Sequence, residues 1–197
     1  MRKVETLNKV KEITIQNVVA SATFKQTIDL AAIVRFFPSV EYQPEVFPGL
    51  AFKLKRPKTC TLIFNSGRMV CTGAKSTSLA RKAIMKVARE LKKAGINITG
   101  KPEIKIQNIV ASVDLGGVSV DIAGLYETGR EFRGSILYEP EQFPGLIYRM
   151  KSPKVVFLVF STGRLVCVGA KREEEVYEAA EKLMATLEER GVLSKEA

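Results

Sequence analysis

Two copies of one sequence pattern constrain the fold of this 197-residue chain more than any other feature. For example, IQNVVAS returns as IQNIVAS, and TLIFNSGRMVCTGAK returns as FLVFSTGRLVCVGAK. The matched segments are 15–21 with 106–112, 27–34 with 119–126, 42–58 with 138–154, and 61–75 with 157–171. A two-copy repeat of this length predicts two similar halves related by a pseudo-twofold axis, because a solenoid needs more units.

Each copy reads as a β-α-β-β-β-β-α unit, and we divide the chain into repeats at 1–99 and 100–197. The opening strands are expected at 12–22 and 103–114, followed by a short helix with Thr27 or Asp29 as its N-cap. Apolar stripes predict a long closing helix in each copy, ended by Gly95 and Gly191. The remaining strands of the first copy are expected at 40–43, 50–55, 59–65 and 68–73. The growing offset between copies places a short insertion within 127–135.

Alternation along the strands gives each sheet two apolar faces. It assigns Cys60, Leu62 and Phe64 to one face, and Thr61 and Ile63 to the other. Helices on one side of an antiparallel sheet cover only one of these faces. The second face is then exposed, apolar and dotted with Thr, Gln and Asn, which is typical of an interaction surface.

The charge of the chain is unevenly distributed. Its net charge is +10, and residues 1–99 hold 18 basic but only 6 acidic side chains. A basic half fits a polyanion such as nucleic acid, and the slightly acidic second half fits a protein partner. No apolar run reaches the roughly 18 residues of a membrane span, and no signal peptide is recognised. We therefore expect a cytoplasmic, nucleoid-associated protein, or a nuclear one if the source is eukaryotic.

The sequence contains few of the residues that proteins commonly use for catalysis and metal binding. The chain contains no histidine, and its three cysteines form no CxxC pair. These facts argue against a zinc site, a metal site in general and a histidine-based active site. We expect no catalytic residue, no cofactor and no enzyme activity. Alternation places Cys60 and Cys71 on opposite faces, which favours free thiols but leaves a disulfide open.

The spaced motifs IQN[VI]VAS, [EQ]-FPGL, PK before a strand, and F-x-[ST]-G-R-x-V-C-x-GAK resemble those of the TATA-box-binding protein family. The resemblance extends from about Lys11 to about Arg190, and the lack of a long amino-terminal extension suits an archaeal member. It implies an α+β saddle: a ten-stranded antiparallel sheet with four helices on the convex face. The family is itself a known example of strands binding and bending DNA through the minor groove.

The resemblance also implies roles for side chains on the uncovered face. The DNA-wedging aromatic residues would be Phe47, Phe64, Phe143 and Phe160, although an aromatic residue in a strand more often belongs to the core. An apolar floor against sugars and base edges would be formed by Val19, Leu62, Val70, Thr72, Val110, Leu158, Val166 and Val168. Val168 stands where the family often has a second Thr, so the half-sites would be read unequally. Asn17 and Asn108 would contact central bases, while Gln16 and Gln107 would point toward the strand seam.

Further roles concern phosphate and protein partners. The resemblance assigns phosphate contacts to Lys53, Arg68, Lys75, Arg149, Arg164 and Lys171, with hydroxyls from Ser66 and Thr162. The loop YEPEQFPG resembles the surface that the family offers to transcription factor B, through Glu139 and Glu141. Gln142 replaces the leucine usual in eukaryotic members, so the apolar part of that contact differs.

The sequence therefore predicts a general transcription initiation factor that binds and bends TATA-box promoter DNA. It would recruit transcription factor B directly and RNA polymerase indirectly, and dimerisation of the free protein stays open. One alternative is a nucleic-acid-binding module of the same sheet type that accompanies a nuclease or glycosylase. Another is a small-ligand-binding domain, which would have an enclosed pocket and no need of a basic half.

Overall fold

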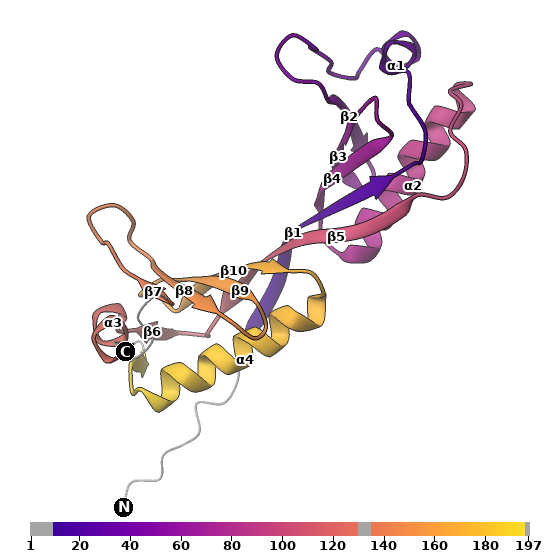
Figure 1. The fold of residues 1–197 in the computed structure, drawn as a ribbon. Coiled ribbons are helices and arrows are strands. Elements are labelled where there is room, and N and C mark those ends of the chain that lie inside the picture. The colour runs from indigo at the N-terminus through magenta and orange to yellow at the C-terminus, as the bar shows by residue number, and fades with distance from the viewer. Residues whose placement is uncertain (1–9, 130–134, 196–197) are drawn as a thin grey trace, which may run out of the picture. The chain divides into compact units, whose positions relative to one another are not determined.

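The computed structural model describes residues 10–129 and 135–195, which form two compact units (Figure 1). The N-terminal unit is Ile15–Ile109. The C-terminal unit consists of the described residues of Met1–Thr14 and Val110–Ala197. Residues 130–134, in the expected insertion, lie outside the described part of the chain.

The elements follow the repeat. The first copy forms β1 (Glu12–Thr23), α1 (Leu30–Phe36), β2 (Leu50–Lys55), β3 (Lys58–Ile63), β4 (Arg68–Ala74) and α2 (Thr77–Lys93). The second copy forms β5 (Glu103–Asp114), β6 (Val118–Val120), α3 (Ile122–Thr128), β7 (Ile136–Leu137), β8 (Leu146–Met150), β9 (Val155–Val159), β10 (Arg164–Ala170), α4 (Glu173–Glu189) and β11 (Leu193–Lys195). The α+β class with four helices and a large antiparallel sheet is thus confirmed over the described residues.

The strand count differs from the expected ten. Nine strands form one sheet in the order β2-β3-β4-β1-β5-β10-β9-β8-β7, and β6 pairs with β11 in a separate sheet. The strand expected at 40–43 is reduced to a single bridge between Glu41 and Ala51. It stops there because the amides of Val46 and Phe47 both donate to the carbonyl of Gln43, which turns the chain away from the sheet.

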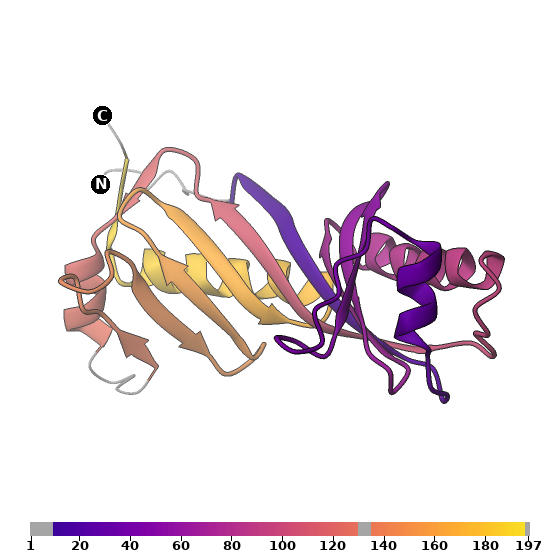
Figure 2. The same ribbon diagram turned by 90° about the horizontal axis from the view of Figure 1, so that it is seen from above.

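Helices α2 and α4 each cover one face of the strands in their own unit (Figures 1 and 2). Helix α2 begins at its N-cap Ser76, whose hydroxyl accepts a hydrogen bond from the Leu79 amide at 3.1 Å. The apolar stripe of α2 is buried through Ala80, Ala83, Ile84, Val87, Ala88 and Leu91. The matched stripe of α4 is buried through Val176, Ala179, Ala180, Leu183, Met184 and Leu187. Burial of these stripes provides the core of each unit.

The short helices begin as the sequence suggested. Of the two expected caps for α1, the structure selects Asp29, whose carboxylate accepts from the Ala32 amide at 3.0 Å. Asp121 caps α3 in the same way through the Gly124 amide. The repeat therefore extends to the local hydrogen bonds that start each helix.

Candidate nucleic-acid interface

The predicted alternation of the strands is confirmed. On β3, Thr61 and Ile63 are completely buried, while Cys60 and Leu62 are half-buried. Directly paired residues of antiparallel strands point to the same side, so the pairing of Leu62 with Val70 joins β3 and β4 into one surface. The same pairing joins Leu158 and Val166 in the C-terminal unit.

Two matched rows of half-buried side chains result, which we call the open rows. The N-terminal open row contains Asn17, Val19, Leu62, Val70 and Thr72. The C-terminal open row contains Val110, Leu158, Val166 and Val168, while Asn108, matched to Asn17 and also half-buried, falls in the N-terminal unit. Each row lies on the face opposite the residues that pack under its long helix. All residues expected to form an apolar floor thus lie on the open rows.

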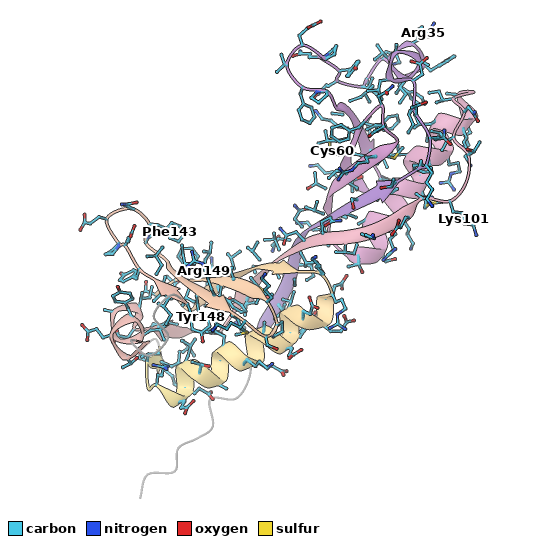
Figure 3. The ribbon with its side chains drawn as sticks, viewed as in Figure 1. Arg35, Cys60, Lys101, Phe143, Tyr148 and Arg149 are labelled. Carbon is cyan, nitrogen blue, oxygen red and sulfur yellow. The ribbon has the colours of Figure 1, made fainter. Side chains whose placement is uncertain are left out.

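The four phenylalanines expected to act as wedges form two ring pairs. Phe47 and Phe64 have ring centroids 5.9 Å apart at an interplanar angle of 71°. Phe143 and Phe160 repeat this edge-to-face contact at 5.8 Å and 68°. Figure 3 labels Phe143, in the loop that precedes β8. Phe47 is 43% exposed, and the other three rings are half-buried.

Glycines make room for these pairs. A Cβ on Gly49 would lie 2.5 Å from the ring of Phe47 and 3.0 Å from that of Phe64. A Cβ on Gly145 would lie 2.7 Å from Phe143 and 3.0 Å from Phe160. A Cβ at either position would force the ring of Phe47 or Phe143 to shift, so the Pro-Gly pairs leave room for each aromatic pair to close as it does.

The turns beside the rings also need glycine. Gly67 has φ of +83°, and its amide donates to the Phe64 carbonyl at 3.0 Å. A Cβ there would collide with the carbonyl oxygens of Phe24 and Gln26. Gly163 has φ of +72° and repeats the turn with Phe160. The SGR and TGR motifs therefore fix where the second ring of each pair lies.

A basic hollow occurs at the same place in each unit. The N-terminal hollow, of about 530 Å³, is lined by ten residues: Gln16, Asn17, Lys53, Leu54, Lys58, Thr59, Cys60, Thr72, Gly73 and Lys75. The C-terminal hollow, of about 600 Å³, is lined by Arg149, Met150, Lys154, Val155, Val156, Val168, Gly169, Lys171 and Glu175. Eight of these lining positions match across the repeat, three of them cationic. The hollows suit an anion such as a phosphate group.

Two cations in these hollows were missed by the sequence reasoning. Lys58 and Lys154 line the hollows beside the expected Lys53, Lys75, Arg149 and Lys171. The sequence does contain a pattern that could have identified them, since the dipeptide Pro-Lys precedes a strand in both copies.

Several expected phosphate ligands have internal partners. The ammonium of Lys53 donates to Glu41, and this hydrogen bond raises the pKa of Lys53. Lys75 donates to the backbone carbonyl of Gln16 at 2.8 Å and to its side-chain oxygen at 3.2 Å. Arg149, labelled in Figure 3, forms no ion pair with another described residue.

The remaining cations and hydroxyls lie at the hairpin turns. Arg68 and Ser66 are exposed at the β3–β4 turn, and Arg164 and Thr162 are exposed at the β9–β10 turn. Arg164 and Thr162 also line a hollow of about 590 Å³ that includes Phe160. The turn residues are thus placed beside the aromatic pairs in both units.

Asn17 is held in a defined orientation. Its side-chain oxygen accepts from the Gly73 amide at 2.7 Å, and its Nδ2 donates to the Thr72 hydroxyl at 3.1 Å. An amide NH₂ carries two hydrogens, so Asn17 retains a second donor for a partner on the open row. Gln107 donates to Ser21 on the neighbouring strand at 2.7 Å, as expected for a residue at the strand seam.

The polar residues of the loop expected to bind a protein partner are accessible to solvent. Glu139, Glu141 and Gln142 are all exposed. The amides of Gln142 and Phe143 donate to the Glu139 carbonyl at 2.9 Å, so the loop begins with a tight turn. This turn places Glu139 and Glu141 within four residues of Phe143 in the chain.

The thiols are unsuited to nucleophilic chemistry at neutral pH. All three cysteines are free, and Cys60 and Cys71 lie on opposite faces as predicted. Burial raises the pKa of Cys71, and it raises that of Cys167 to about 12. Among residues 10–129 and 135–195, no cluster of His, Cys, Asp or Glu could hold a metal ion. No helix in these ranges is long and apolar enough to cross a membrane.

Comparison with known proteins defines the class. A family model described as "Transcription factor TFIID (or TATA-binding protein, TBP)" matches residues 12–94 and again 103–190. A TATA-box-binding protein from Sulfurisphaera tokodaii is 51% identical over 178 residues, which cover 90% of this chain and 87% of that protein. The one from Methanocaldococcus jannaschii is 48% identical, covering 90% and 94%. The chain therefore belongs to the TATA-binding protein family of transcription factors.

A solved structure supports the same conclusion. The structure named Methanococcus jannaschii TBP aligns with a TM-score of 0.81 and 46% sequence identity. The alignment covers 90% of this chain and 99% of that one. The similarity thus extends over both copies of the repeat.

The half-burial of the aromatic pairs leads to a prediction about stability. Phe160→Ala should lower the free energy of unfolding by less than about 2 kcal/mol, because the ring already contacts solvent. Phe157→Ala is the matched control three residues earlier, on β9, since Phe157 is completely buried and its loss should cost ~3–5 kcal/mol. Urea unfolding of both variants measures the difference. Equal losses would show that Phe160 belongs to the core.

Proposed function

We propose that this protein is a general transcription initiation factor that binds TATA-like promoter DNA through the minor groove and bends it. The observation that supports this function best is the presence of two matched open rows, each bordered by an aromatic pair and a basic hollow. An apolar row fits sugars and base edges, while cations at its border fit the flanking phosphates. Archaeal relatives and the DNA-associated role support a location at the nucleoid.

In this proposal the aromatic pairs wedge into base steps at the two ends of the box. Apolar side chains that enter the minor groove unstack base steps and kink the duplex, and the family is a known example of this behaviour. Phe47 with Phe64, and Phe143 with Phe160, are positioned for it because each pair is half-exposed at the border of its open row. Arg68 and Arg164, at the adjacent turns, would hold the phosphates beside each kink.

The principal experiment measures binding and bending together. Gel mobility shifts should show a preference for a TATA duplex over a GC-rich duplex of equal length. Moving the box along the fragment should change the mobility of the complex, because a bend near the centre retards it most. Phe64→Ala and Phe160→Ala should reduce this position dependence. A parent protein without a preference for the TATA duplex would contradict the proposed function.

Asn17 and Asn108 are proposed to read the central base pairs. In the minor groove an A·T pair presents only acceptors, whereas a G·C pair adds the guanine amino donor. The free donor of Asn17 suits those acceptors, and its orientation is already set by Gly73 and Thr72. Val168 stands at the position matched to Thr72, so the two halves would read DNA unequally.

Replacing either asparagine should therefore weaken sequence discrimination. Asn17→Ala or Asn108→Ala should lose ~1–3 kcal/mol of discrimination against a central G·C pair, with little change on random DNA. Competition between a TATA duplex and one with a single central G·C pair measures the loss. If both variants discriminate as well as the parent, specificity would arise from the deformability of TA steps.

We further propose that the loop containing Glu139, Glu141 and Gln142 binds transcription factor B, which in turn recruits RNA polymerase. Both carboxylates are exposed beside the aromatic pair, where a basic partner can reach them while DNA is bound. The neutral Gln142 adds polar rather than apolar contact at this position.

Charge reversal at this loop should separate the two interactions. Glu139→Lys with Glu141→Lys should leave binary DNA binding nearly intact and weaken the ternary complex with transcription factor B by about tenfold or more. The matched control is the N-terminal loop variant Glu45→Lys, which should leave the ternary complex unchanged. Supershift titration measures both steps. Equal loss of binary and ternary binding would mean that the loop acts through Phe143.

A further inference from the structure

The two basic hollows differ in the ion pairing of one matched cation. Lys53 on β2 and Arg149 on β8 occupy matched positions, and each lines its hollow. Lys53 is paired with the Glu41 carboxylate, whereas the residue matched to Glu41 is Leu137. Arg149 consequently has no carboxylate partner among the described residues.

The backbone holds Glu41 in this place. The Glu41 amide donates to the Ala51 carbonyl at 3.1 Å, and the Ala51 amide donates back at 2.8 Å. Leu137 is in the same register opposite Ile147. Because residues opposite each other share a face, Glu41 lies diagonally next to Lys53, two positions beyond Ala51. Glu41 and Leu137 thus hold matched places across from β2 and β8, and only Glu41 supplies a carboxylate.

Other charges near the hollows do not cancel this difference. Lys58 and Lys75 in the first hollow are matched by Lys154 and Lys171 in the second. The second hollow also contains Glu175, but that carboxylate accepts from the Lys171 and Arg172 amides and from the Arg172 guanidinium. Those bonds hold Glu175 at the start of α4 and leave Arg149 without an ion pair to it.

We propose that Glu41 competes with the DNA backbone for Lys53 and so weakens the phosphate contact of the first hollow relative to the second. The proposal rests on the proposed DNA-binding function and identifies Glu41 and Leu137 as residues that set the unequal strength of its two halves. A phosphate that approaches Lys53 must displace an existing carboxylate, while one that approaches Arg149 displaces only water and counterions. Both side chains of the Lys53–Glu41 pair are more than half exposed, so the effect is modest.

Exchanging the two residues provides the test. Glu41→Leu should tighten binding to a TATA duplex by about two- to fivefold at low salt. It should also steepen the log–log dependence of affinity on salt by up to about 0.9, the value of one phosphate contact. Leu137→Glu should produce the opposite changes of similar size. Fluorescence anisotropy over a series of KCl concentrations measures affinity and slope, and thermal unfolding confirms that each variant is folded.

Double variants show whether the effect passes through the assigned cation. The gain from Glu41→Leu should vanish in a Lys53→Met background, and the loss from Leu137→Glu should vanish with Arg149→Met. An effect that persists without Lys53 would mean that Glu41 merely repels DNA, which overturns the proposal. So would parent-like affinity and slope in Glu41→Leu. Failure of the parent itself to prefer TATA DNA would instead refute the proposed function, so the two failures are distinguishable.

Discussion

Burial of one sheet face under an amphipathic helix is the interaction on which the rest of each unit depends. An antiparallel sheet with a helix on one side can bury only alternate residues, and here Ile63, Met69 and Cys71 are completely buried. The intervening residues must then face the other way. They remain only half-buried in the protein alone, so the covered face provides the stability and the open face is available for a ligand. The position of α2 and α4 thereby determines where the open rows lie.

The borders of the open rows are shaped by the backbone more than by side-chain packing. Gly67 and Gly163 adopt positive φ where neighbouring carbonyl groups leave no space for a Cβ. Gly49 and Gly145 allow the aromatic rings to approach the chain. These constraints place apolar rings at an accessible border without relying on a buried pocket. A rigid border is suited to a wedge, since a mobile ring would lose conformational entropy on insertion.

Much of this arrangement could be predicted from the sequence because it follows from periodicity. The alternation of residues correctly predicted which side chains of β3 and β4 share a face, and the turn glycines correctly predicted the hairpins. The contacts of the segment that follows each long helix could not be predicted, because this segment binds different partners in the two repeats. In the first, Gln26 bonds to the Asn97 carbonyl and the Thr99 amide; in the second, β11 pairs with β6. Such contacts join residues more than 70 positions apart and leave no local pattern.

In the candidate site, too, local sequence patterns predicted some features, while contacts between distant residues decided others. The residue types and faces of the open rows are local properties, whereas the partner of each cation depends on which side chain lies across the sheet. Lys53 and Arg149 look equivalent in the aligned repeats, yet the bridge at Glu41 places a carboxylate beside only one of them. Sequence reasoning that treats matched cations as equal therefore overlooks the charge that neutralises one of them.

The two repeats keep the same core positions, although several buried residues differ, and they also differ at residues that we propose contact DNA. The buried stripes of α2 and α4 and both aromatic pairs keep their positions, while Thr72 becomes Val168 and Glu41 becomes Leu137. Two identical halves would bind a pseudo-symmetric groove equally well in either direction. Under the proposed function, the change of a hydroxyl on the open row and of a carboxylate at its border would make the two directions unequal in energy. A repeated fold can in this way acquire polarity through a few half-exposed side chains.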